Sequence, residues 1–345
     1  MERIHKIMPP DKAASDAAKE RWDSVAKPLG SLGLLEDMVC RLAAIQGTPD
    51  VDISRRVCVV MCADNGVVCE GVTQSDSSVT ALCANEIAAG RSSVNAIAKS
   101  VNADVVAVDI GVAGDTIAVD RKISRGTKNI ADGAAMSPAA AEAAVSVGID
   151  LVRQHKENGV HIMITGEMGI GNTTTAAAVT SVLLGLPPEA VTGRGAGLDD
   201  ARLKHKTEVI QRAIEVNRPD RHKPVELLAK LGGLDIAGMA GLFLGGAIYR
   251  VPVIIDGMIS AAAAAVAASI EPLCAEYMLA SHCSSEPAGR LLLDNLRTKA
   301  PIQAGMRLGE GTGGLMLLPL LDCALGIYRN AHRFDEIKLE RYRPL

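Results

Sequence analysis

Short apolar runs alternate along the chain with long segments rich in alanine and leucine. Four runs of mainly β-branched residues each end beside a glycine or an acid, at residues 57–62, 105–109, 160–165 and 251–256. Such runs are typical of strands buried on both faces of a parallel sheet. The intervals predict helices over residues 75–100, 138–157, 173–184, 199–216, 225–231 and 260–270. This alternation predicts an α/β fold built from βαβ units.

The two ends of the chain have a different pattern. Residues 11–26 and 34–45 are typical of two amphipathic helices, and no strand is evident there. Residues 313–330 predict another helix, followed by a charged tail. We therefore predict a small helical domain made of residues 1–45 and about 315–345, and a large α/β domain at residues 46–314.

Composition excludes several classes of protein. The chain has 345 residues, a formal net charge of -4 and only seven aromatic residues, so it offers neither a basic field nor stacking rings for nucleic acid. Its longest apolar stretches, residues 236–248 and 258–270, are shorter than the roughly 20 residues that span a bilayer. With no secretory signal at the N-terminus, we expect a cytoplasmic protein. The eight cysteines show no CxxC pair or zinc-ligand spacing, and we predict no metal site.

Acidic residues follow the four predicted strands: Asp64, Asp109, Glu167 and Asp256. Each alone is more typical of a turn or a helix cap. Ligands of open parallel sheets bind beyond the carboxyl ends of the strands, where all four acids are expected. Their common position therefore favours a functional site.

A glycine-rich segment, residues 166–175, leads from a predicted strand into a helix and resembles a phosphate loop. Asn172 stands where a nucleoside-triphosphate loop requires lysine. Gly169, Gly171 and the hydroxyls of Thr173 and Thr174 could still bind a monophosphate at the helix N-terminus. A capped strand-to-helix turn is an equally good interpretation. A second glycine loop, residues 192–200, precedes a helix that carries Lys206, although a lysine two turns into a helix is usually a surface charge.

A third loop, Gly309-Glu310-Gly311-Thr312-Gly313-Gly314, matches GxGxxG but lacks the flanking strands of a dinucleotide site. It presents Glu310 between two glycines beside an apolar helix. Desolvation there would raise the pKa of the carboxyl group and suit it to general-base work. The alternative is an acid in a first helical turn, favoured by the helix dipole.

Taken together, these motifs resemble the nicotinate-nucleotide:dimethylbenzimidazole phosphoribosyltransferase family over nearly the whole chain. The resemblance rests on six ordered segments, at residues 27–33, 62–67, 166–174, 232–239, 256–257 and 307–313. It implies a doubly wound, mainly parallel sheet with a small helical domain formed by both chain ends, a homodimer, and no cofactor or metal. It also implies transfer of the phosphoribosyl group of nicotinate mononucleotide to an aromatic base, for the lower ligand of cobalamin.

The resemblance assigns roles to individual residues. Glu310 would be the catalytic base, and Glu167 would stabilise positive charge on the ribose. Phosphate and nucleotide binding would fall to Gly169, Gly171, Asn172, Thr173, Thr174, Lys206, Asp235 and Asp256. The acceptor base would lie against Ser75, Cys83, Leu308 and Met258.

The sequence departs from the family pattern near the expected acceptor site. The family often has histidine at Asn65 and glutamine at Cys83, and an aromatic residue common after Asp256-Gly257 is absent. The preferred acceptor therefore stays open among dimethylbenzimidazole, other benzimidazoles, purines and phenols.

Two other function classes fit some of these features. A magnesium-dependent transferase would use the four acids that follow the strands to act on a pyrophosphorylated sugar. A non-catalytic nucleotide sensor would keep the phosphate loops but would not need Glu310.

Overall fold

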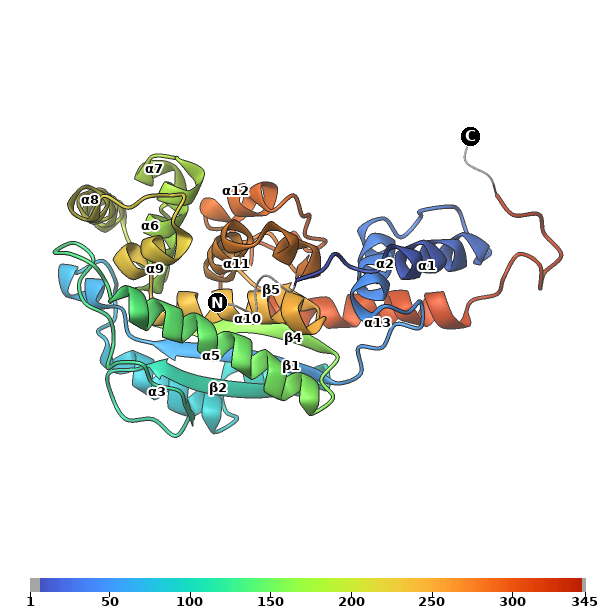
Figure 1. The fold of residues 1–345 in the computed structure, drawn as a ribbon, viewed down its shortest axis with the longest axis horizontal. Helices are drawn as coiled ribbons and strands as arrows, with labels where there is room; N and C mark the ends of the chain where they lie inside the picture. Colours follow the sequence, from blue (N-terminus) through green and yellow to red (C-terminus); the bar gives the residue numbers. More distant parts are fainter. Residues whose placement is uncertain (1–6, 343–345) are drawn as a thin grey trace.

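The sheet has six parallel strands in the order β3-β2-β1-β4-β5-β6 (Figure 1). The computed structural model describes residues 7–342. The strands are β1 (Arg56–Ala63), β2 (Asp104–Gly111), β3 (Val119–Asp120), β4 (Ile162–Met168), β5 (Val253–Ile255) and β6 (Met278–Ala280). The chain winds outward from β1 in one direction and from β4 in the other, which confirms a doubly wound α/β fold and places a crevice between β1 and β4.

Helices cover both faces of the sheet, and alternate residues of each strand face opposite layers. In β1, Val57 and Val59 join one core while Cys58 and Val60 join the other. The first core packs under α5 (Pro138–Glu157), α6 (Asn172–Leu184), α9 (Pro224–Leu231), α10 (Leu234–Tyr249) and α11 (Met258–Ile270). The second packs under α2 (Leu34–Gln46), α3 (Ser78–Ala88), α4 (Ser93–Ser100) and α13 (Thr312–Asn330). Both faces of the central strands are therefore dry, as their continuous apolar sequences predict.

Helices α5 and α10 approach each other closely through small residues. A Cβ atom on Gly148 would lie 2.1 Å from the Gly238 carbonyl oxygen, and one on Gly241 would lie 2.1 Å from the Val145 carbonyl oxygen. Only glycine permits this separation of the two backbones. The contact fixes α10, whose N-terminus lies behind the candidate site described below.

The helix predicted over residues 75–100 is wrong in one respect, because it is two helices. Gly90 adopts a left-handed conformation with φ of +78°, which ends the first helix. Ser92 and Asn95 then form a capping box that begins the second. The turn brings the N-terminus of α4 toward the carboxyl edge of the sheet.

Several short elements lie outside the sequence prediction. These are strands β3 and β6, the 3-10 segments η2 (Gly66–Glu70) and η3 (Pro272–Tyr277), and helices α7 (Pro188–Val191) and α12 (Ala288–Asn295). Strand β5 is also shorter than predicted. Runs of two to eight residues carry little periodicity from which their type could be read in the sequence. Helix α8 (Asp200–Asn217), in contrast, begins one residue after the predicted start, where the Asp199 side chain accepts from the Arg202 amide.

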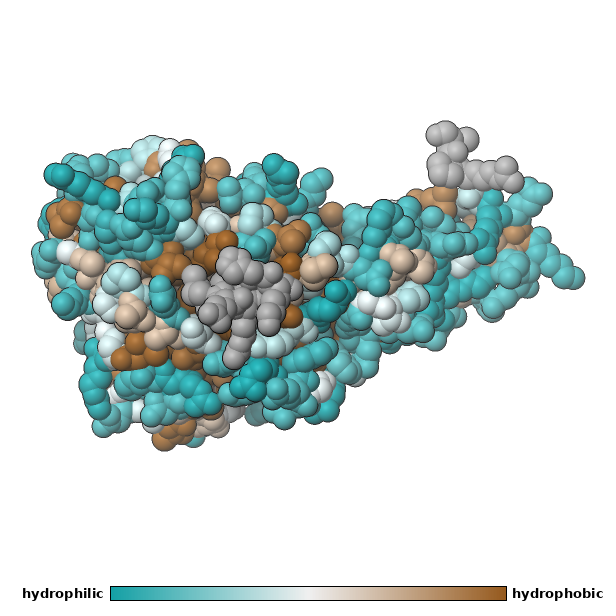
Figure 2. Space-filling model, in the orientation of Figure 1, coloured by the Kyte–Doolittle hydropathy of each residue, from teal (hydrophilic) through white to brown (hydrophobic). Residues whose placement is uncertain are grey.

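Helices near the two ends of the chain pack together beside the sheet. Helix α1 (Lys12–Ser24) packs on α2, and both lie along the second half of α13 (Figure 1). The rings of Trp22 and Tyr328 are 5.0 Å apart, and residues 25 and 333 form a β-bridge. Hydrophilic residues cover most of this part of the surface in Figure 2. The helices predicted at the two ends are confirmed, while their separation as a domain stays a prediction. Among the described residues, no helix is long and apolar enough to cross a membrane.

Candidate active site

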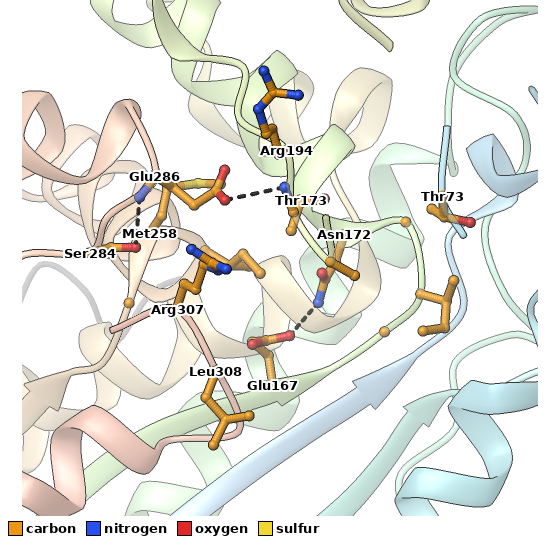
Figure 3. Close-up of a pocket in the computed structure, with 18 of the residues that line it drawn as sticks. Thr73, Glu167, Asn172, Thr173, Arg194, Met258, Ser284, Glu286, Arg307 and Leu308 are labelled. Atoms are coloured by element: carbon orange, nitrogen blue, oxygen red, sulfur yellow. Dashed lines mark hydrogen bonds between the residues drawn. The ribbon is translucent and has the colours of Figure 1, made fainter. Parts of the chain in front are cut away.

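A cavity of about 220 Å³ opens beyond the carboxyl ends of β4 and β5. Its walls come from segments distant in sequence, as Figure 3 shows for 18 of its residues. They include residues 72–75, 167–173, 194–196, 198, 256–260, 282, 284, 286 and 307–310. All three glycine loops of the sequence contribute to it. The cavity is therefore the place where the separate sequence motifs meet.

Glu167, the second-last residue of strand β4, lies at the bottom of the cavity with 8% of its surface exposed. Its carboxylate accepts a hydrogen bond from the Asn172 side-chain amide (Figure 3). Burial, with further contributions from Asp235 and Asp256, raises the pKa of Glu167 to about 8 despite the Asn172 hydrogen bond. At neutral pH, burial therefore favours the protonated form of this group.

Asp256, directly after β5, fixes the third glycine loop. Its two carboxylate oxygens accept from the backbone amides of Gly311 (3.2 Å) and Gly314 (2.9 Å), at the start of α13. Burial raises the pKa of Asp256 to about 7, against the effect of these amides. Although this acid lines the cavity, its carboxylate oxygens are engaged by the loop.

Glu310 is held in an uncommon backbone conformation by that loop. Its φ is +61°, between Gly309 at +84° and Gly311 at +89°, and a non-glycine residue in this region is strained by about 1–3 kcal/mol. The loop lies directly on β4: a Cβ atom at Gly166 would lie 2.5 Å from the Glu310 carbonyl oxygen. The strain presents the Glu310 side chain at the cavity wall.

The Glu310 carboxylate approaches the N-terminus of α4. Its Oε2 accepts from the Val94 amide at 3.3 Å. Burial raises the pKa of Glu310, and the Val94 hydrogen bond opposes that rise. A carboxylate with a raised pKa at the edge of a cavity can accept a proton from a bound ligand.

Lys206 enters the same cavity from α8, although its sequence position suggested a surface charge. It is 1% exposed, and its Nζ donates to the Thr173 hydroxyl at 2.9 Å and to the Gly193 carbonyl at 3.2 Å. Burial lowers the pKa of Lys206 to about 8, while Glu286 opposes the shift. Close to Lys206, α6 begins at Asn172 and presents its N-terminus to the cavity. A cation beside a helix N-terminus forms a site suited to a phosphate.

The other wall is aliphatic. Leu308, Met258 and Ile259 line it, with Val72 and Ser75 on the facing segment. Leu308 is 58% exposed, so an apolar group is available to cover a bound ring. This wall is close to the Glu310 loop and provides the surface expected for a flat aromatic acceptor.

Not every residue predicted for the site lines the cavity. Thr174 is fully buried on α6, and Asp235 is fully buried behind Asn172. Asp235 turns back onto its own helix, where its Oδ1 accepts from the Ile236 amide at 3.0 Å. Cys83 on α3 is near enough to Glu310 for that acid to raise its thiol pKa, after burial itself, but it is not a lining residue. A direct contact of Asp235 with nucleotide is therefore not supported.

The expected convergence of four acids is wrong, because Asp64 and Asp109 are bound elsewhere. Asp109 pairs with Lys122 at 3.0 Å and accepts from the Thr116 hydroxyl. Asp64 accepts from the Ala113 amide at 2.8 Å. Neither lines the cavity. Within residues 7–342, no group of three or more histidine, cysteine or acidic side chains is placed to hold a metal ion.

Sequence reasoning missed residues 282–286, which close the cavity beside β6. The Glu286 carboxylate accepts from the Gly195 amide at 3.2 Å, and its own amide donates to the Ser284 hydroxyl (Figure 3). His282 also lines the cavity, and burial lowers its pKa. The available signal was Met278-Leu279-Ala280, a three-residue apolar run followed by polar residues.

Comparisons with known proteins agree with one another. The sequence model of a family described as Phosphoribosyltransferase matches residues 7–339. The chain is 43% identical to the nicotinate-nucleotide--dimethylbenzimidazole phosphoribosyltransferase of Acetivibrio thermocellus, over 96% of each chain. It is 44% identical to the enzyme of the same name from Desulforamulus reducens, over 97% of each chain. The crystal structure of CobT from Thermus thermophilus superposes with a TM-score of 0.90 at 36% identity, covering 96% of this chain and all of that one.

Proposed function

The chain belongs to the phosphoribosyltransferase family that these comparisons identify, and we propose that it transfers the phosphoribosyl group of nicotinate mononucleotide to 5,6-dimethylbenzimidazole or a related aromatic base. The products are nicotinate and α-ribazole 5'-phosphate, for the lower ligand of cobalamin. The single observation that carries this proposal is the placement of Glu310 and the Lys206 site in one cavity with an aliphatic wall.

The nucleotide phosphate is assigned to the N-terminus of α6, with Gly169, Gly171 and Thr173, and to Lys206. A phosphate near Lys206 raises the pKa of its amine back toward the ordinary value, which strengthens the ion pair. The ribose then lies over Glu167. The anionic phosphate thus lies beside the Lys206 cation, and the ribose lies beside the Glu167 carboxyl group.

In the reaction, the bond from ribose C1' to the pyridinium nitrogen breaks, and its electron pair returns to the nicotinate ring. The ring nitrogen of the departing nicotinate becomes neutral, so no general acid is needed. Positive charge develops on the ribose as the bond breaks, and the Glu167 carboxylate is positioned to stabilise it.

The acceptor nitrogen attacks C1' from the face opposite nicotinate, which gives the α-anomer. Its ring is assigned to the wall formed by Leu308 and Met258, near Ser75. As the new C–N bond forms, the ring loses its N–H proton to Glu310. Burial raises the pKa of the Glu310 carboxyl group, which suits it to accept the proton.

The proposal extends to assembly and place of action. The family resemblance supports a homodimer working in the cytoplasm without metal or other cofactor, with small molecules as its only substrates. Light scattering coupled to gel filtration would give twice the 36.0 kDa chain mass for a dimer. A single-chain mass would contradict that part of the proposal.

Incubation with nicotinate mononucleotide and a panel of acceptors tests the function. Dimethylbenzimidazole, benzimidazole, adenine and phenol would be compared by the rate of nicotinate release. We expect release that depends on the acceptor and survives a metal chelator. No release with any acceptor would overturn the function, and loss of release on chelation would favour the magnesium-dependent transferase.

A further inference from the structure

A buried polar cluster behind the cavity joins two carboxylates through one amide. The Asn172 Nδ2 atom donates to Glu167 Oε2 and also, at 3.1 Å, to Asp235 Oδ2. An amide nitrogen carries two hydrogens, and here each has a carboxylate partner. Glu167, Asn172 and Asp235 are 8%, 4% and 0% exposed, respectively. The amide therefore links the acid at the cavity floor to an acid that no solvent reaches.

Hydrogen bonds hold Asp235 in this position behind the cavity. Its Oδ1 accepts from the Ile236 amide at 3.0 Å, and the Asn65 side chain donates a further hydrogen bond to it. Asn65 is itself fixed, because its Oδ1 accepts from the Thr175 hydroxyl at 3.1 Å. Asp235 thus affects a bound ligand through Asn172 and Glu167, and not by contact.

The surroundings of the pair leave its charge uncompensated. Among the described residues, neither acid forms an ion pair with lysine, arginine or histidine. The titratable groups that face the pair are Asp256 beyond β5 and the Cys62 thiol on β1. Glu310, Lys206, Arg307 and His282 line the cavity in front of Glu167. Two uncompensated carboxylates at low dielectric constant resist simultaneous ionisation.

We propose that Asp235 is a positioning residue for Glu167: linked by the Asn172 amide, the two carboxylates share one proton in the free protein, and a nucleotide with a cationic pyridinium base releases that proton when it binds. This inference rests on the proposed function, because that function supplies the cation. The pyridinium charge beside Glu167 favours its ionised form. The proton passes to solvent, and the bound complex then has the carboxylate that the developing ribose cation requires.

The direction in which burial shifts both pKa values agrees with a shared proton. Burial raises the pKa of Glu167 to about 8 and that of Asp235 to about 6, so the pair keeps a proton at neutral pH in the free protein. The cluster also connects the 232–239 motif to the cavity, because Asp235 contacts Asn172, a residue of the cavity wall.

Calorimetric titration with nicotinate mononucleotide at pH 7, in two buffers of different ionisation enthalpy, measures proton release without turnover. We expect about one proton released per nucleotide bound. Uridine monophosphate supplies a phosphate and a neutral base, so its binding should release almost none. Equal release with both nucleotides, or no release with nicotinate mononucleotide, would overturn the inference. Both outcomes leave the proposed function intact if nicotinate is still formed with an acceptor.

The variant Asp235→Asn keeps the side-chain shape and removes its charge. The pH profile of kcat/KM reports the essential groups of the free enzyme, and we expect its acidic limb to shift down by about one pH unit or more. At pH 6, the ratio of kcat/KM to its maximum value should then be about tenfold higher in the variant than in the wild type. Asp235→Glu should keep the wild-type limb, as should Asp109→Asn, a buried acid outside the cavity. A uniform loss of activity with an unmoved limb would show that Asp235 is only structural.

Discussion

Two neighbouring parts of the same sheet edge carry similar acids with opposite surroundings. Beyond β2, Asp109 faces Lys122 at 3.0 Å, and its oxygens also accept from the Val112 amide and the Thr116 hydroxyl. Beyond β4, Glu167 has an amide partner and two further acids nearby. The first arrangement completes its own charge balance, whereas the second requires positive charge from elsewhere. The difference separates an acid that holds a loop from one that we propose acts on the ligand.

The largest effect should come from Glu310→Gln, in the part of the sheet edge that forms the cavity. Glutamine can still accept from the Val94 amide but cannot take the proton of the acceptor ring. We expect kcat for nicotinate release to fall by about 10²- to 10⁴-fold, with KM for nicotinate mononucleotide little changed. Asp109→Asn serves as the control. An equal loss of activity in both variants would contradict the distinction between the cavity acids and the buried acid beyond β2.

The next effect is a loss of stability in the part of the sheet edge beyond β2. Lys122→Ala leaves Asp109 buried without its cation, and breaking such a pair costs about 3 kcal/mol. Urea denaturation should show this loss in the free energy of unfolding, while KM for the nucleotide stays near the wild-type value. A raised KM with unchanged stability would place Lys122 in the binding site instead.

In contrast with Lys122→Ala, Lys206→Ala should change nucleotide binding more than stability. A charge-assisted hydrogen bond contributes about 1.5–3 kcal/mol, which corresponds to a rise of about 10- to 100-fold in KM for nicotinate mononucleotide. The turnover at saturation should change far less. Initial rates over a range of nucleotide concentrations separate the two constants. A fall in kcat at constant KM would move Lys206 from phosphate binding to the chemical step.

The last effect is the pH dependence of stability. The folded-state pKa of Glu167 is raised from 4.5 to about 8, so the folded state binds more protons than the unfolded state between these values, and stability falls as the pH rises through this window. We expect the wild-type Tm to fall between about pH 5.5 and 8.5, and Glu167→Gln to reduce that fall. Asp109→Asn provides the comparison. A steeper fall in Glu167→Gln would contradict the assigned ionisation.

Much of the fold followed from pattern, because long elements carry strong periodicity. The helix predicted over residues 138–157 has the bounds of α5, and the four long apolar runs all form parallel strands. The exceptions have local causes. Gly90 divides one predicted helix, and β6 is three residues long, too short for its alternation to be recognised.

Sequence motifs located some residues of the candidate site and missed others, for a related reason. Motifs locate Glu310 and Glu167, since glycine loops and strand ends are visible in sequence. They do not reveal that Lys206 is buried, that Asp109 has a cation, or that Glu286 reaches the cavity. Each of these depends on a contact between distant segments: Lys206 meets Thr173 on another helix, and Glu286 meets Gly195. Such contacts are set by packing, which one sequence does not display.

Product analysis by NMR of a mixture containing the protein, nicotinate mononucleotide and 5,6-dimethylbenzimidazole shows whether the phosphoribosyl group is transferred to the base. We expect equal amounts of nicotinate and of an α-linked ribosyl phosphate attached to a ring nitrogen of the base. Nicotinate accompanied by free ribose phosphate would indicate hydrolysis, and unchanged nucleotide would indicate binding alone. Either result would contradict the transfer chemistry assigned to this cavity.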